Sequence, residues 1–345
     1  MGIRFEFFEA GCGDSILVST DEGTNVLIDG GVTETYKNEI SYRIDELDKL
    51  NLVILTHIDN DHICGLIELI NDKYSRDKID ELWFNTPSSK LMIQPTFNND
   101  IGYGQGEYFH KIIKKYKLNH KDNIYVEAEN IYNIASDIEL ILLSPMKKNL
   151  DALKRQWNKN DFLRDCNGKK LDISGEIPID DRREIEQLFN SLSELGKDSS
   201  YTNKSSIAFI LEYQKHQQFL FLGDSDIRVI NKSLENLGYS KDNRLSVEFI
   251  KLSHHGSKKN INEEFLDLVD CDTFVVLTNG LHPNSSHYKH PDKETLSLIL
   301  KHSNRKKNIN FNFNYILPIE KKFARDMREE ESYKFVANCQ NIMEY

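Results

Sequence analysis

The segment Thr56–His62 places two histidines and two aspartates directly after the apolar run Leu52–Leu55. The apolar run predicts a buried strand, and the polar residues predict the loop or helix start at its carboxyl end. Imidazole and carboxylate groups at this spacing suit divalent metals. Because four potential ligands are more than one ion takes from a single turn, the segment predicts half of a two-metal site.

These side chains also have an ordinary alternative role. Asp59 or Asn60 could cap a helix that starts near Ile63, and the two histidines could lie on the surface. We prefer metal binding because other apolar runs also end in candidate ligands. Those other candidate ligands are Asp29, Asp224, His254 and His255.

The composition is that of an ordinary globular protein, with 39% hydrophobic and 29% charged residues among 345. No stretch approaches the roughly 20 apolar residues of a membrane span, and the charged N-terminus does not resemble a secretory signal. Five scattered cysteines fit free thiols in a reducing compartment, so we expect a cytoplasmic protein. A net charge of −11 argues against a broad grip on a nucleic-acid backbone, but not against a local one.

Short apolar runs separated by turn residues predict a layered α/β protein with helices outside the sheet. The predicted strands are 5–9, 15–19, 25–29, 52–55, 82–85, 124–126, 138–143, 206–211, 218–222, 247–252 and 273–278. The predicted helices are 37–50, 63–71 and 293–302. We expect one domain over 1–345, with a polar, partly helical insertion at 146–201 as a cap or lid and a C-terminal extension at 305–345.

The order of these motifs resembles the metallo-β-lactamase fold family. An aspartate closes an early strand, an H-x-[HD]-x-D-H segment follows, and a later Gly-Asp precedes a final histidine at a strand end. The resemblance implies an αββα sandwich of two mixed sheets. Within the family, the chain is most similar to the soluble hydrolase domain of the ComEC/Rec2 DNA-uptake proteins. The phrases that carry this likeness are Ala10–Ser15, Asn203–Ser206, Ser253–Ser257 and His290-Pro291.

The resemblance implies a set of metal ligands, with Asp224 bridging two ions. The implied ligands are His57 and Asp59 for one ion, Asp61 and His62 for the other, Asp224 between them, and His254 or His255 to complete the second site. We favour His254, because adjacent side chains of a strand point to opposite faces and His254 follows its apolar run as His57 does. His255 would then contact substrate.

Further residues are expected around the ligands. Asp29, Asn203 and His287 are expected to support the ligands or contact substrate, and Asp61 and His290 to take part in catalysis. Asp59 stands where many family members have histidine, and Asn203 replaces another histidine. These oxygen ligands favour Mn²⁺ or Mg²⁺ over zinc at the first site, and we expect two divalent ions, Zn²⁺ or Mn²⁺.

Two such ions hold a hydroxide between them and clamp the entering and leaving oxygens at phosphorus. We therefore expect a phosphodiesterase or nuclease that acts on nucleic acid or a nucleotide. The alternatives are hydrolysis of a small amide, lactone or thioester, and a non-catalytic module that binds a protein partner through 146–201 or 305–345. Repair, nucleotide turnover and phage defence all remain open as biological roles.

Overall fold

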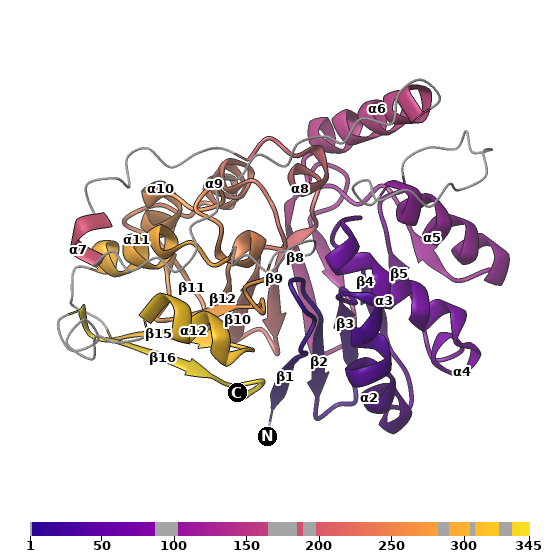
Figure 1. Cartoon of the computed structure of the whole chain (residues 1–345), viewed down its shortest axis with the longest axis horizontal. Coiled ribbons are helices and arrows are strands. Elements are labelled where there is room, and N and C mark those ends of the chain that lie inside the picture. Colours follow the sequence, from indigo (N-terminus) through magenta and orange to yellow (C-terminus); the bar gives the residue numbers. More distant parts are fainter. Residues whose placement is uncertain are drawn as a thin grey trace.

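Two β-sheets pack face to face and helices cover both outer faces (Figure 1). The computed structural model describes residues 2–86, 103–164, 185–188, 198–281, 290–303, 308–323 and 333–345. This arrangement confirms the predicted αββα sandwich. Among the described residues, no helix is both long and apolar enough to cross a bilayer.

The first sheet has the strand order β17-β1-β2-β3-β4-β5-β6. Its strands are β1 (Ile3–Phe7), β2 (Ile16–Thr20), β3 (Asn25–Ile28), β4 (Leu52–Ile54), β5 (Leu82–Trp83), β6 (His120–Lys121) and β17 (Ile342–Glu344). Strands β1 to β3 form the expected antiparallel meander, and β3 to β6 run parallel. The apolar runs of β3 and β4 are buried throughout, as expected for parallel strands covered on both faces.

The second sheet has the order β16-β15-β14-β12-β10-β9-β8-β7. Its strands are β7 (Ile131–Asn133), β8 (Ile138–Ser144), β9 (Ala208–Tyr213), β10 (Gln217–Phe221), β12 (Ile250–Lys251), β14 (Thr273–Val276), β15 (Ile309–Phe313) and β16 (Phe335–Cys339). The predicted hairpin between β9 and β10 is antiparallel. A separate parallel pair joins β11 (Leu245–Ser246) to β13 (Val269–Asp270).

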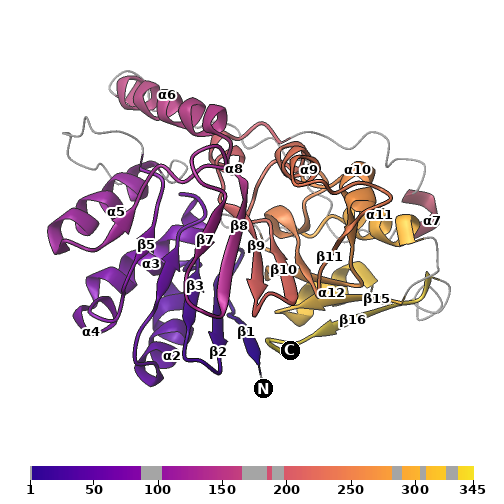
Figure 2. The same cartoon turned by 180° about the vertical axis from the view of Figure 1, so that it is seen from behind.

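Helices form the outer layers (Figure 2). Over the first sheet lie α1 (Thr33–Thr35), the π-helical turn η1 (Tyr36–Ile40), α2 (Ser41–Glu46), α3 (Asn60–Asn71), α4 (Lys73–Arg76), α5 (Tyr103–Tyr116) and α6 (Lys147–Arg164). The remaining helices are α7 (Ile185–Leu188), α8 (Tyr201–Lys204), α9 (Ile227–Asn236), the 3-10 turn η3 (Ser253–Gly256), α10 (Glu263–Leu268), α11 (Lys293–Ser303) and α12 (Ile316–Phe323).

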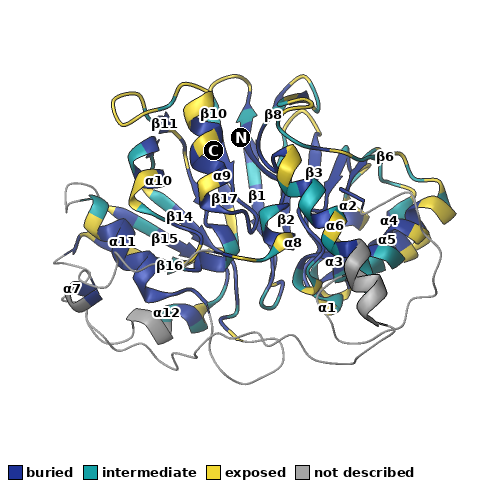
Figure 3. Cartoon of the chain, turned by 90° about the horizontal axis from the view of Figure 1, so that it is seen from above, coloured by how far each residue is buried: buried dark blue, intermediate teal, exposed yellow. Residues whose placement is uncertain are grey.

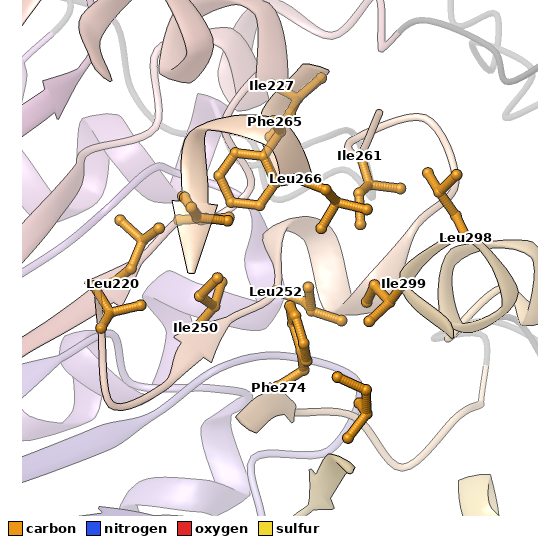
Figure 4. Close-up of a cluster of buried hydrophobic side chains, with 14 of the residues drawn as sticks. Leu220, Ile227, Ile250, Leu252, Ile261, Phe265, Leu266, Phe274, Leu298 and Ile299 are labelled. Carbon is orange, nitrogen blue, oxygen red and sulfur yellow. The ribbon is translucent and has the colours of Figure 1, made fainter. Parts of the chain in front are cut away.

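Three apolar clusters fill the spaces between the four layers. The middle cluster joins side chains of both sheets, including Phe5, Phe219 and Phe249, whose rings lie 4.5 to 5.2 Å apart. Another cluster lies between the second sheet and α9 to α11, where Phe265 packs among leucine and isoleucine side chains (Figure 4). Burial follows these layers, and exposed residues gather on loops and outer helix faces (Figure 3).

The predicted strand at 124–126 is wrong, because β7 lies at Ile131–Asn133 instead. The backbone groups of Ile124 bond to one side chain rather than to a strand: its N–H donates to Asn85 Oδ1 at 2.7 Å, and its carbonyl accepts from Asn85 Nδ2 at 2.9 Å. The long helix predicted at 37–50 is divided between η1 and α2, and ends at Glu46.

The expected insertion and the expected extension both contribute to the packed layers. Leu150 and Trp157 of α6 are buried in the cluster over the first sheet, and Ile185 is buried over the second. Residues after 308 supply β15 and β16 to the second sheet and β17 to the first. The backbones of Ile3 and Tyr345 exchange two hydrogen bonds of 3.0 Å, so the chain ends lie together (Figure 1).

A close backbone contact holds the turn after β3 against α3. Gly30 N–H donates to the carbonyl of His62 at 2.8 Å, and Gly65 N–H donates to the carbonyl of Gly31 at 3.1 Å. A Cβ atom on Gly65 would lie 1.9 Å from the carbonyl oxygen of Gly30. Only glycine therefore lets the first turns of α3 approach the end of β3 this closely.

Replacing Gly65 with alanine tests this contact. In an exposed helix interior the change would stabilise by about 1 kcal/mol, but here the added methyl group meets fixed backbone. We expect Gly65→Ala to destabilise the protein by about 1–3 kcal/mol in urea unfolding. Glu68→Ala, one turn further along the same helix, is the control and should stay within about 0.5 kcal/mol of the parent. A stabilised Gly65→Ala variant would contradict the interpretation.

Candidate metal centre

The candidate ligands meet at one edge of the sandwich because each follows the carboxyl end of a strand. His57 and Asp59 lie in the loop after β4, and Asp61 and His62 lie in the first turn of α3. Gly223-Asp224 follows β10, and His254-His255 lies in η3 after β12. Strands β10 and β12 are parallel neighbours, so their ends meet at the same edge.

Asp224 lies at the centre of this cluster, and its carboxylate faces four imidazoles. The separations are 3.8 Å from Oδ2 to Nε2 of His57, 3.7 Å from Oδ1 to Nε2 of His62, and 3.8 Å from Oδ2 to Nε2 of both His254 and His255. These distances are too long for hydrogen bonds. Two ligand atoms bonded to one ion at about 2.0 to 2.2 Å each lie at separations of this size.

Two further carboxylates complete the cluster. Asp59 Oδ2 lies 3.6 Å from Nε2 of His57, and Asp61 Oδ2 lies 3.5 Å from Nε2 of His255. Asp59 occupies the N-cap position of α3, but its side chain makes no capping hydrogen bond. The alternative role of Asp59 as a helix cap is therefore not the one its side chain adopts.

The Nδ1 atoms of the four histidines point away from Asp224 to protein partners. His62 Nδ1 donates to Asp29 Oδ2 at 2.8 Å, and His255 Nδ1 donates to the carbonyl of Leu277 at 2.9 Å. His57 Nδ1 lies 3.0 Å from the hydroxyl of Thr56, which itself donates to Asp29. Such partners fix the ring orientation and leave Nε2 for a metal.

The unpaired atoms of the cluster test whether a metal fits here. Nε2 of His57, His62 and His255, Oδ1 of Asp224 and Oδ1 of Asp59 are buried and have no hydrogen-bond partner among the described residues. A buried polar group without a partner is costly. Several such nitrogens and oxygens facing one point form a donor set that suits a divalent cation.

Both histidines of the His254-His255 pair face Asp224, so the expectation that only His254 does so is wrong. Strand β12 ends at Lys251, and η3 gives His254 and His255 positive φ angles of 50° and 56°. Strand alternation therefore does not apply to this pair. His254 is fixed on its other side by Asp198 and Asn260, each 3.3 Å from Nδ1.

The remaining predicted residues lie around these ligands. Asn203 Nδ2 lies 3.3 Å from Nδ1 of His254 and donates a hydrogen bond to Asp198 at 2.8 Å. Asn203 is therefore linked to the centre through His254 and Asp198. The ring of His290 lies 5.2 Å from that of His254, and its Nδ1 lies 3.6 Å from Asp292 Oδ2. His287 lies outside the described residues.

Buried carboxylates and imidazoles in the cluster shift each other's pKa values. Burial opposes the charged form of each carboxylate, but the neighbouring histidines hold the pKa of Asp224 well below its ordinary value, and His255 and His62 lower the pKa of Asp61. Burial also opposes the charged imidazole of His255, yet Asp224 and Asp14 raise its pKa to about 9. Without metal, the proton on His255 supplies positive charge beside these carboxylates.

A buried ion pair behind His255 was not predicted from the sequence. Asp14, in the turn after β1, forms an ion pair with Lys251 of β12, and its Oδ1 lies 3.2 Å from Nδ1 of His255. Asp14 and Lys251 are 2% and 1% exposed, so almost no water screens the pair. A lysine within the apolar run Phe249–Leu252 was the available signal. No sequence signal pointed to Asp198, which contacts His254, because it lies in a polar segment without periodicity.

Comparison with known proteins agrees with this fold. Residues 11–73 match the model of the metallo-beta-lactamase superfamily. No curated protein sequence matches the chain. The match, together with the His/Asp cluster, supports a metal-dependent hydrolase.

Similar solved structures share little sequence with this chain. A diphosphatase from the PhnP family is 11% identical with a TM-score of 0.39 and covers 91% of this chain and 85% of that one. The long form RNase Z from yeast is 11% identical with a TM-score of 0.43, covering 100% and 48%. The isothiocyanate hydrolase from Delia radicum gut bacteria is 9% identical with a TM-score of 0.40, covering 99% of each.

Metal uptake should release protons at neutral pH. Metal ligation requires neutral imidazole, but the pKa of His255 is raised to about 9, so this ring is protonated at pH 7.5. We expect the apparent affinity for Zn²⁺ to rise about tenfold per pH unit for this proton and to level off above pH 9. Calorimetric titration at pH 7.5 in two buffers of different ionisation enthalpy measures the protons released. Uptake without proton release would contradict the assignment of His255.

Variants of the buried pair should separate stability from metal binding. Asp14→Asn leaves the Lys251 charge buried without its partner, and we expect a loss of about 3–5 kcal/mol in urea unfolding of the metal-free protein. Asp14→Asn with Lys251→Met removes both charges and should recover most of that loss. If Asp14 also orients His255, the double variant should still bind Zn²⁺ about 10–100-fold more weakly than the parent in a chelator competition assay. Full recovery of both properties would reduce Asp14 to a structural role.

Proposed function

We propose that the protein is a binuclear metal-dependent phosphodiesterase. The observation that carries the proposal is the single carboxylate of Asp224 at 3.7 to 3.8 Å from four imidazole nitrogens. One carboxylate shared between two groups of nitrogen ligands suits two ions held side by side.

We divide the proposed ligands into two groups that share Asp224. His57, Asp59 and His254 would hold the first ion, and Asp61, His62 and His255 the second. His254 thereby supplies the nitrogen that Asn203 does not. The first group still contains Asp59, and its oxygen favours Mn²⁺ there more than an all-histidine set would. The second group contains Asp61 in the same way, so each ion would have two imidazoles and one carboxylate besides Asp224.

When bound, a pair of divalent ions activates water and stabilises charge on the oxygens of a phosphodiester. Asp224 would hold both ions, and the buried imidazoles of His57, His62 and His255 exclude solvent from the centre. In hydrolysis the water oxygen bonds to phosphorus while the bond to the leaving oxygen breaks, and that oxygen takes up a proton. His290 lies beside His254 and next to Asp292, and this position supports its imidazole as the donor of that proton.

The likeness to the ComEC/Rec2 hydrolase domain extends this proposal. Asp14, Asn203 and His254 belong to the sequence motifs that carry this likeness. Asp14 lies beside His255, Asn203 lies beside His254, and His254 faces Asp224. We further propose that residues 146–201 form a wall that limits substrate entry. Helix α6 packs against α8, which carries Asn203, and both lie at the end of the sandwich opposite the chain termini (Figures 1 and 2).

Substitution of Asp61 tests the function directly. Asp61→Ala removes a proposed ligand and also a negative charge near Asp224. We therefore expect hydrolysis to be lost, while the thermal unfolding temperature of the metal-free protein is unchanged or slightly raised.

Replacement of His290 tests the proposed proton donor. The His290→Ala variant should keep its metal content and lose about 10²-fold in kcat. Asp77→Ala, an exposed aspartate on the surface, is the control.

The assay uses bis-p-nitrophenyl phosphate, single- and double-stranded DNA, RNA and cyclic dinucleotides with Mn²⁺ or Zn²⁺. Amide, lactone and thioester substrates are tested beside them under the same conditions. Parent activity on these substrates without phosphodiesterase activity would overturn the proposal. An Asp61→Ala enzyme with the parent's turnover number would remove Asp61 from the mechanism.

A further inference from the structure

A second charged feature lies next to the metal centre. A surface cavity of about 390 Å³ opens between the start of α6, α8 and the first turns of α9. Its charged lining consists of Lys148, Lys204, Arg228 and Lys232 against one carboxylate, Asp226. We call this cavity the basic pocket.

The cations of the basic pocket are largely available to a ligand. Asp226 caps α9 by accepting from Arg228 N–H at 3.1 Å, and it forms an ion pair with the Arg228 guanidinium. Lys148, Lys204 and Lys232 have no carboxylate partner within the part of the chain that the structure describes. Three unpaired lysines around one hollow repel each other unless an anion lies between them. On a chain with a net charge of −11, this local excess of positive charge is unlike the protein as a whole.

Short chain connections join the basic pocket to the metal centre. Lys204 follows Asn203, whose amide lies 3.3 Å from His254 Nδ1. Asp226 stands two positions after Asp224. Arg228 interacts electrostatically with Asp198, which lies 3.3 Å from the same His254 nitrogen. An anion in the pocket is therefore separated from the metal ligands by about one layer of side chains.

We propose that the basic pocket binds a backbone phosphate of a nucleic-acid strand whose neighbouring phosphodiester lies at the metal centre. The inference rests on the proposed function for the position of the cleaved bond. A small phosphodiester fills only the centre, whereas a strand carries further phosphates at regular intervals that reach the lysines. The substrate class is thus an oligonucleotide, recognised through its backbone and without regard to base sequence.

Binding without hydrolysis tests the pocket separately from catalysis. Fluorescein-labelled single-stranded DNA and RNA 12-mers are titrated with the full chain in EDTA, and anisotropy is followed at several salt concentrations. The pocket variant is Lys204→Ala with Lys232→Ala. The control is Lys49→Ala with Lys73→Ala, which removes the same charge. Lys49 precedes β4 and Lys73 follows the far end of α3, whereas the metal centre lies at the opposite end of both elements.

We expect the pocket variant to bind both 12-mers on the order of tenfold more weakly than the parent, and the control variant to bind like the parent. The plot of log K against log salt should become shallower by about 0.7, the value for one phosphate contact of a single strand. With metal restored, the ratio of kcat/KM for the 12-mer to that for bis-p-nitrophenyl phosphate should fall by a similar factor.

Three outcomes would overturn the proposal that the basic pocket binds a backbone phosphate. They are equal binding by the pocket and control variants, no binding by the parent, and binding of an oligoglutamate of equal charge as tight as that of the 12-mers. If the parent hydrolyses bis-p-nitrophenyl phosphate in any of these cases, the proposed phosphodiesterase stands and only the pocket fails. If the parent binds the 12-mers through the pocket but hydrolyses no phosphodiester, the pocket stands and the catalytic proposal fails.

Discussion

The buried carboxylate of Asp29 is the interaction on which the geometry of the centre depends. It lies at the end of β3 with a positive φ of 57° and is 0% exposed. Oδ1 accepts from Thr56 N–H at 2.7 Å, and Oδ2 accepts from the Thr56 hydroxyl at 2.7 Å and from His62 at 2.8 Å. One side chain therefore ties the end of β3 to the end of β4 and to the start of α3. Two of the histidines take their orientation from it, directly for His62 and through Thr56 for His57.

The second sheet meets this arrangement through backbone contacts. Ile207 N–H donates to the carbonyl of Thr56 at 2.9 Å, and His254 N–H donates to the carbonyl of Gly223 at 3.0 Å. The first bond joins the two sheets at the edge where the ligands lie. The second fixes the turn that carries His254 and His255 to the turn that carries Asp224. The strand ends thus hold the candidate ligands in fixed positions around Asp224.

Charge balance explains how so many ionisable groups are tolerated in a buried place. The histidines lower the pKa of Asp224, and the carboxylates raise that of His255, so opposite charges in the cluster stabilise each other when metal is absent. Lys251 plays a different part, because it compensates Asp14 behind the ligands and takes no position facing Asp224. Positive charge is thereby distributed in two layers: imidazoles around the centre, and a lysine beneath one of them. The basic pocket adds a third group of cations on the surface beside them.

The amino-acid sequence alone predicted the layered fold and most of the residues that meet at the candidate centre. Apolar runs predicted the buried strands because burial on both faces requires them, and ligands at run ends follow from where strands terminate. The cluster of His57 to His62, with Asp29 and Asp224, could be found in this way. Only the tertiary structure decided the rest. The two left-handed residues of η3 bring both His254 and His255 to Asp224, and a sequence pattern based on strand alternation does not contain that turn.

Contacts between distant segments were equally outside the reach of sequence patterns. Asp14 and Lys251 are paired because β1 and β12 belong to different sheets that pack face to face, and Asp198 reaches His254 from a polar segment without periodicity. The last strands show the same limit, since β16 joins one sheet and β17 the other although they are adjacent in the chain. Local periodicity reports which face of an element is buried, whereas the partner against which it is buried depends on the packing of the whole chain.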